Sequence, residues 1–115
     1  MDNLITRWWR AVWPFSPWRI VAEVDAADEV PDRLPRKGAV LVGSRQHPKW
    51  IAFDCPCGAR HRILLPLDAR QRRHWQLRPG ARLTLWPSID AIEGARRCHY
   101  FITHGRTVWA RDEEP

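Results

Sequence analysis

Apolar and polar residues alternate along most of the chain from residue 19 onward, and this pattern predicts short β-strands. In the segments 19–25 and 82–86, apolar side chains recur at every second position, which is typical of strands that bury one face. We expect the second of these to end at Pro87. The sequence predicts a mainly β fold, a small antiparallel β domain with a closing hairpin at His104–Gly105. The other expected strands are 39–42, 49–54, 62–65, 74–77, 99–103 and 106–110.

The beginning of the chain has a different periodicity. In residues 3–13, apolar side chains recur at helical spacing while Arg7 and Arg10 lie on the opposite side, which predicts a short amphipathic helix. We therefore divide the chain into a Trp/Arg-rich N-terminal arm, residues 1–18, and a single β domain, residues 19–115. An Arg/Trp helix could lie on an anionic membrane surface. Packing on the domain or on a partner is the preferred interpretation, because stable membrane anchoring usually needs a second signal.

Composition narrows the class of protein. The chain has 115 residues, of which 44% are hydrophobic and 28% charged, which is typical of one globular domain. No apolar run approaches the roughly 18 residues that a spanning helix needs, so an integral membrane protein with helical spans is excluded, as is a large multidomain enzyme. The N-terminus does not match a secretory signal, and we expect a cytoplasmic protein.

The three cysteines predict a metal site. Cys55 and Cys57 share one tight Cys-Pro-Cys-Gly turn, His61 follows four residues later, and Cys98 is the remaining cysteine. Zinc prefers four thiolate and imidazole ligands, so these residues form the expected set for Zn2+. Since neighbouring side chains of a strand point to opposite faces, His99 is expected to be left free for another role. The alternative is three unrelated thiols, with Cys98 a small buried hydrophobe.

The sequence leaves open whether this site is structural or catalytic. A closed shell of four ligands is structural, whereas a catalytic zinc keeps one position for water. Three thiolates also weaken the Lewis acidity of the ion, which favours a structural role. If the site is catalytic, its proton carrier has to come from nearby groups such as Asp54 or His99, and the spacing singles out none of them.

The net charge of +6 is concentrated in residues 60–82, where seven Arg stand against one Asp. A basic loop beside a zinc turn can bind nucleic acid, but no aromatic RNA-binding motif accompanies it. An anionic protein surface, or no partner at all, fits this segment equally well. Among the eight Trp, we expect Trp50, Trp75, Trp86 and Trp109 in or around the core, and those of the N-terminal arm, including Trp18, at an interaction surface.

Several short sequence segments, taken in order, resemble those of a known family of small bacterial proteins of unassigned function. Its members are often encoded beside ubiquitin-like proteins and homologues of ubiquitin-activating and ubiquitin-conjugating enzymes. The resemblance covers nearly the whole domain. It rests on Arg7-Trp8-Trp9-Arg10, Trp50-Ile51-Ala52-Phe53-Asp54-Cys55-Pro56-Cys57-Gly58, His61-Arg62-Ile63-Leu64-Leu65, Leu83-Thr84-Leu85-Trp86-Pro87-Ser88-Ile89, Cys98-His99-Tyr100-Phe101-Ile102, Gly105-Arg106 and Trp109.

The resemblance implies a metal-binding accessory protein of a bacterial ubiquitin-like conjugation system, with the ubiquitin-like protein and the conjugation enzymes as partners. It implies a site made of Cys55, Cys57, His61, Cys98 and His99, with Ser88 as a polar residue nearby. Ala59 stands where relatives carry a further Cys, so three thiolates are the maximum here.

Three hypotheses follow. The first is a zinc-dependent peptidase that processes a ubiquitin-like protein, with His99, Asp54 and Ser88 as candidate catalytic residues. The second is a non-catalytic adaptor with structural zinc that docks conjugation partners. The third, a nucleic-acid-binding zinc ribbon, has the least support.

Overall fold

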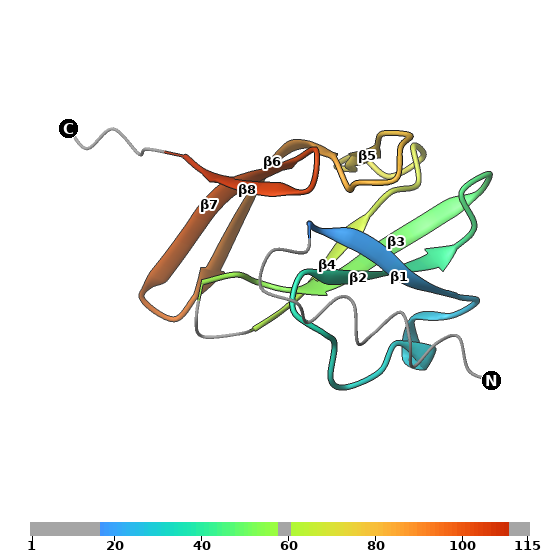
Figure 1. Cartoon of the computed structure of the whole chain (residues 1–115), viewed down its shortest axis with the longest axis horizontal. Coiled ribbons are helices and arrows are strands. Elements are labelled where there is room, and N and C mark those ends of the chain that lie inside the picture. Colours follow the sequence, from blue (N-terminus) through green and yellow to red (C-terminus); the bar gives the residue numbers. More distant parts are fainter. Residues whose placement is uncertain (1–16, 58–60, 111–115) are drawn as a thin grey trace.

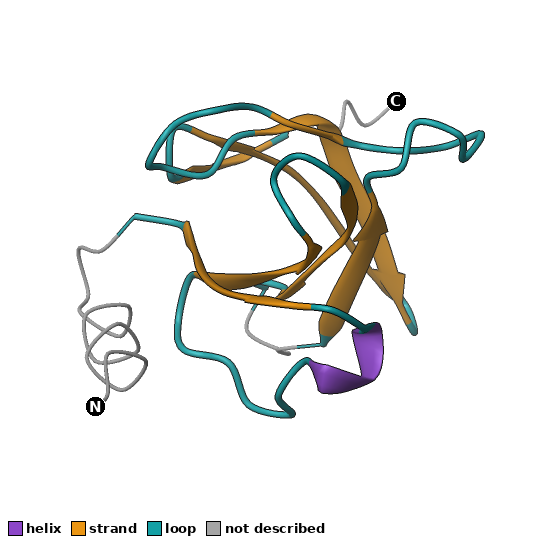
Figure 2. Ribbon diagram, turned by 90° about the vertical axis from the view of Figure 1, so that its right-hand side faces the viewer, coloured by secondary structure: helices purple, strands orange, loops and turns teal. Residues whose placement is uncertain are grey.

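Two four-stranded sheets make up the fold, as seen in a computed structural model that describes residues 17–57 and 61–110 (Figures 1 and 2). The N-terminal sheet has the strand order β1-β2-β3-β4, and the C-terminal sheet has the order β5-β6-β7-β8. The first contains β1 (Arg19–Val24), β2 (Gly38–Gly43), β3 (Pro48–Asp54) and β4 (Arg62–Pro66). The second contains β5 (Gln76–Leu77), β6 (Leu85–Glu93), β7 (Arg96–Thr103) and β8 (Arg106–Trp109). The mainly β fold and the β7–β8 hairpin were predicted correctly.

One strand pair departs from the predicted antiparallel fold, because β1 pairs with β2 in parallel. The connection between these strands, residues 25–37, is long enough to return the chain to the same end of the sheet. All other pairs are antiparallel. This connection contains the one helix that the described residues form, a 3-10 turn at Ala27–Glu29. The helix predicted at 3–13 lies outside the described residues.

The prediction that a strand ends at Pro87 was wrong. Strand β6 begins at Leu85 and continues through Pro87 to Glu93. The Trp86–Pro87 peptide bond is cis, and the pairing of β6 with β7 is irregular between Leu85 and Ile89. A proline is tolerated inside a strand at such an irregularity, because no ladder hydrogen bond is required of its nitrogen. The polar residue that follows, Ser88, therefore lies within the strand rather than in a loop.

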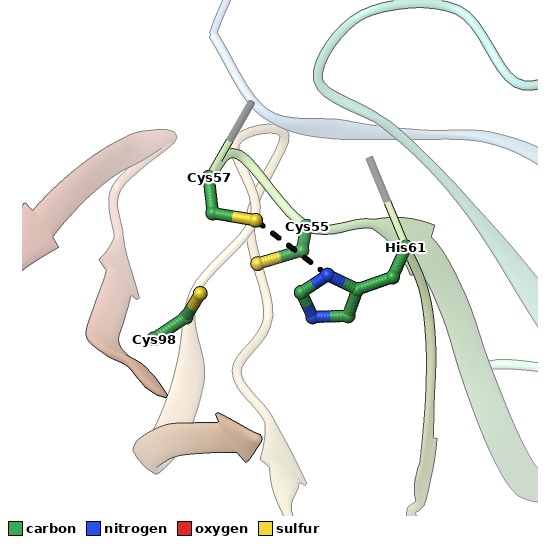
Figure 3. Close-up of side chains that lie close together, drawn as sticks. All are labelled: Cys55, Cys57, His61 and Cys98. Carbon is green, nitrogen blue, oxygen red and sulfur yellow. Dashed lines mark hydrogen bonds between the residues drawn. The ribbon is translucent and has the colours of Figure 1, made fainter. Parts of the chain in front are cut away.

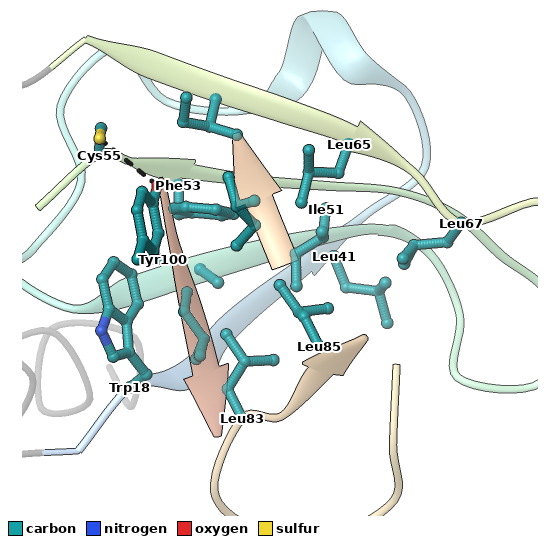
Figure 4. Close-up of a cluster of buried hydrophobic side chains, with 14 of the residues drawn as sticks. Trp18, Leu41, Ile51, Phe53, Cys55, Leu65, Leu67, Leu83, Leu85 and Tyr100 are labelled. Atoms are coloured by element: carbon teal, nitrogen blue, oxygen red, sulfur yellow. Dashed lines mark hydrogen bonds between the residues drawn. The ribbon is translucent and has the colours of Figure 1, made fainter. Parts of the chain in front are cut away.

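The hydrophobic core lies between the two sheets (Figure 4). Leu41, Ile51 and Phe53 contribute from the N-terminal sheet, while Leu85 and Tyr100 contribute from the C-terminal sheet, all nearly inaccessible to solvent. A smaller cluster of Val21, Leu34 and Val40 covers the other face of the N-terminal sheet. Strand β2 is therefore buried on both faces, which explains its continuous apolar sequence.

Trp18 belongs to the core and not to an interaction surface, contrary to the prediction. Only 1% of it is exposed, and its ring meets Phe53 edge-on with the ring centroids 5.3 Å apart. Its indole N–H donates to Thr107 Oγ1, so it joins the start of β1 to β8. Conversely, Trp86 and Trp109, predicted to lie in or around the core, are half-exposed. The two errors have different reasons: Trp18 precedes β1 and is buried by contacts with distant residues, whereas Trp86 and Trp109 lie in strands, where the register decides which face a side chain occupies.

Among the described residues, the structure contains no helix long and apolar enough to cross a membrane.

Candidate functional site

Four side chains that could ligate a metal, from both sheets, lie close together (Figure 3). Cys55 and Cys57 come from the turn after β3, His61 directly precedes β4, and Cys98 lies on β7. One ligand atom from each residue lies within 4.8 Å of the other three. The sequence predicted this set of four, and the structure brings all of them together.

Local hydrogen bonds shape the turn that carries three of these ligands. The backbone N–H of Cys55 donates to the carbonyl oxygen of His61 at 2.8 Å, which closes the chain between β3 and β4. At the neighbouring ladder position, which lies within the sheet, the Arg62 guanidinium donates to the Asp54 carboxylate at 2.9 Å. These two bonds join the residues on either side of the segment that carries Cys57, and so fix where Cys55 and His61 lie.

One distance within the cluster matches the spacing of two ligands on a tetrahedral zinc ion. Zinc–sulfur and zinc–nitrogen bonds of about 2.3 and 2.0 Å place neighbouring ligand atoms about 3.6 Å apart in a tetrahedron. The observed distance between Cys57 Sγ and His61 Nδ1 is 3.5 Å. No described atom accepts a hydrogen bond from the buried Nε2 of His61, so a bond at Nε2 does not explain the position of the ring. Nδ1, which faces Cys57 Sγ, would be the ligand atom for a bound ion.

The protein environment disfavours thiolates in the absence of a cation. Burial raises the pKa of Cys55, and burial together with the neighbouring thiols raises the pKa of Cys98 to about 12. The Tyr100 hydroxyl donates to Cys55 Sγ at 3.4 Å and partly offsets this effect at Cys55. A dication would reverse this balance, because it stabilises all three thiolates at once.

A second cluster lies on β6 and β7. Ser88 Oγ and His99 Nε2 are 3.0 Å apart, within hydrogen-bond distance, and both residues are partly accessible to solvent. His99 follows Cys98 directly, but the alternation of the strand puts the imidazole on the outer face and the thiol on the inner face. The expectation that His99 is left out of the four-ligand set agrees with this arrangement.

Three further residues surround this pair. Asp90 lies opposite His99 in the β6–β7 ladder, and the Arg97 guanidinium bonds both of its oxygens, at 2.9 and 2.8 Å. These bonds hold the pKa of Asp90 below its ordinary value, so a fixed negative charge faces the imidazole. From the other side, the indole N–H of Trp75 donates to the carbonyl oxygen of Ser88 at 3.2 Å.

Asp54, the third predicted catalytic residue, bonds Arg62 in the N-terminal sheet. No described hydrogen bond or ion pair joins it to Ser88 or His99. The sequence named Ser88 only through the resemblance, and it missed Trp75. The irregular pairing of β6 aligns Ser88 with a histidine eleven residues away, and spacing alone does not reveal that alignment.

The described residues thus define a small protein of two β-sheets, with a serine–histidine contact on one sheet and a partly buried Cys3His cluster that could hold a metal. Residues 26–110 match the family described as bacterial ubiquitination-like system serine protease (BubE), and the chain belongs to this family. The coarser expectation, a family from a bacterial ubiquitin-like conjugation system, is thereby confirmed. Searches among curated proteins and among solved structures found no match.

Proposed function

We propose that this chain is a serine peptidase of a bacterial ubiquitination-like system, with Ser88 as the nucleophile and His99 as its general base. The observation that carries the proposal is the 3.0 Å distance between Ser88 Oγ and His99 Nε2. An alcohol attacks an acyl group efficiently only when a neighbouring base takes its proton, and this pair has that arrangement. The description of the family as a serine protease supports the same assignment.

The proposed reaction has two steps. Ser88 Oγ attacks the carbonyl carbon of the scissile bond while its proton passes to His99 Nε2, and that proton then leaves with the departing amine. Water, deprotonated by the same imidazole, hydrolyses the resulting acyl ester and restores the serine. Asp90, held anionic by Arg97, faces the imidazole and would stabilise the positive charge that it carries between these steps.

The metal cluster has a structural role in this proposal. The four clustered side chains would complete the tetrahedral shell of a zinc ion and leave no position for a water molecule. A zinc ion bound there would fix the turn after β3 onto β7. The zinc-dependent peptidase expected from the sequence therefore becomes a serine peptidase whose fold zinc stabilises. We propose the ubiquitin-like protein of the same system, in precursor or conjugated form, as its substrate.

A fluorophosphonate probe tests the nucleophile without knowledge of the substrate. Its phosphorus forms a covalent bond with an activated serine oxygen, and fluoride leaves. We expect intact mass spectrometry to detect one adduct on the wild-type chain and none on Ser88→Ala. Ser44→Ala, which alters a serine in the β2–β3 connection, is the matched control and should be labelled like the wild type.

A cleavage assay then separates the alternatives. The ubiquitin-like protein, extended at its C-terminus by a short peptide, should be shortened by the wild type and left intact by Ser88→Ala. Unchanged cleavage by Ser88→Ala that stops on chelation would instead support a zinc-dependent peptidase. Binding without cleavage or labelling would support the non-catalytic adaptor.

A further inference from the structure

The outer face of the C-terminal sheet carries a row of apolar side chains next to Ser88 and His99. Phe101 lies opposite Val108 in the β7–β8 ladder, and its ring stacks on that of Trp86 with the centroids 6.5 Å apart. Trp86 and Val108 remain 51% and 49% exposed. One residue thus comes from each of the three strands, and together they form a surface that we call the aromatic row.

The aromatic row is continuous with the proposed catalytic pair. The ring of Phe101 also stacks on the imidazole of His99, with the centroids 6.5 Å apart. Trp86 and Ser88 are two residues apart on β6, and Phe101 and His99 are two residues apart on β7. An acyl group that reaches Ser88 Oγ from solvent therefore has the apolar side chains of Trp86 and Phe101 on one side of it.

The opposite side of the pair has a different chemistry. There the Arg97 guanidinium bonds both carboxylate oxygens of Asp90, so this side carries an ion pair and not an apolar surface. Ile92 lies beyond this ion pair on β6 and is 72% exposed. The face is thus asymmetric about Ser88, with an apolar surface on one side and a closed ion pair on the other.

Backbone dimensions determine which part of a substrate meets the aromatic row. Positions two residues apart along a strand are about 7 Å apart, and the rings extend the surface by several ångströms. An extended peptide advances about 3.4 Å per residue. A chain with its scissile carbonyl at Ser88 therefore reaches the aromatic row with the second to fourth residue from that carbonyl.

We propose that Trp86, Phe101 and Val108 determine specificity by binding a bulky apolar side chain two to four residues before the scissile bond of an extended peptide. This inference rests on the proposed function, because it takes Ser88 as the reacting group. The occupant is an extended peptide segment with one large aliphatic residue upstream of the scissile bond. Burying such a side chain on an apolar surface improves binding about tenfold or more.

Competition with the fluorophosphonate tests this specificity directly. A peptide aldehyde forms a reversible hemiacetal, in which Ser88 Oγ bonds to the aldehyde carbon and the carbonyl oxygen takes up the proton. Acetyl-Leu-Gly-glycinal and acetyl-Gly-Gly-glycinal differ only in the leucine side chain three residues from the reacting carbon. We expect the leucine aldehyde to protect Ser88 from labelling at a concentration about tenfold lower.

Variants assign the preference to its residues. Phe101→Ala should reduce the ratio of the two protective concentrations to about one, and Val108→Ser, at an edge strand, provides a second variant if Phe101→Ala does not fold. Ile92→Ala is the matched control, because it removes an exposed apolar side chain from the same face of β6, and it should keep the ratio.

The outcomes separate this inference from the proposed function. Equal protection by both aldehydes, or no protection by either at millimolar concentration, overturns the inference while labelling of Ser88 still supports the proposed function. A preference for leucine that survives in Phe101→Ala and Val108→Ser also overturns it. Absence of labelling at Ser88 overturns the proposed function itself.

Discussion

Cys98 and His99 are adjacent on β7, and their side chains lie on opposite faces of the same sheet. The thiol joins the buried cluster with Cys55, Cys57 and His61, whereas the imidazole reaches Ser88 on the outer face. One short segment thus connects the metal cluster to the proposed catalytic pair without sharing a ligand between them. The two sites can therefore be perturbed separately.

Replacing His99 by alanine should remove activity and leave the fold intact. Without the base, Ser88 keeps its proton during attack, and kcat/KM on a ubiquitin-like precursor should fall about 10²- to 10⁴-fold. Metal content, measured by atomic emission, and the Tm should stay near the wild-type values, because the imidazole is not among the four clustered ligands. His47→Ala, in the exposed β2–β3 connection, is the control. Loss of metal from His99→Ala would contradict this separation.

Replacing one of the clustered cysteines should mainly lower the stability of the fold. Cys57 is only half-buried, so Cys57→Ser changes the core little but removes one of three thiolates. We expect loss of bound zinc and a Tm about 10–20 °C lower, which corresponds to roughly 3 kcal/mol for a domain of this size. Excess chelator should bring the wild type to the same Tm. If the variant melted like the wild type and carried no metal, the ion would have no structural role.

Zinc binding should release protons. Because burial raises the pKa of Cys55 and of Cys98, the latter to about 12, both thiols are protonated near pH 7 before metal binds. At least two protons per ion should therefore appear, and the affinity should weaken about 100-fold for each unit that the pH falls. Titration calorimetry in two buffers of different ionisation enthalpy measures this number. A heat independent of the buffer would mean that the thiolates exist before the metal arrives.

The Tyr100 hydroxyl should tune the metal site. It donates to Cys55 Sγ at 3.4 Å, and such bonds to ligand atoms typically change metal affinity about 10- to 100-fold. Tyr100→Phe keeps the buried ring, so the Tm of the zinc-bound protein should fall by only a few degrees. Competition with a chromophoric chelator should nevertheless detect the weaker binding. An unchanged affinity would show that the hydroxyl stabilises the metal-free and the zinc-bound protein equally.

The sequence predicted the strands other than most of β6, the closing hairpin and the four clustered ligands, because each depends on local pattern or on ligand chemistry. It missed features that depend on how distant strands are placed. The parallel pairing of β1 with β2 is set by a connection with no strong signal, and the burial of Trp18 depends on contacts with Phe53 and Thr107. The hydrogen bond between Ser88 and His99 depends on the irregular register between β6 and β7. The sequence did not predict this register, because Pro87 was interpreted as the end of the strand.

The chain passes from the N-terminal sheet to the C-terminal sheet through residues 67–75, where Arg70, Arg72 and Arg73 are exposed. These are cleavage sites for trypsin, so the backbone can be cut within this connection. Three of the clustered ligands lie before that point and Cys98 lies after it. A bound ion would thus tie the two fragments together after a cut, as a disulfide does in a nicked secreted protein. In mild denaturant, the two fragments of the cut chain should then separate when a chelator is present and stay together when it is absent.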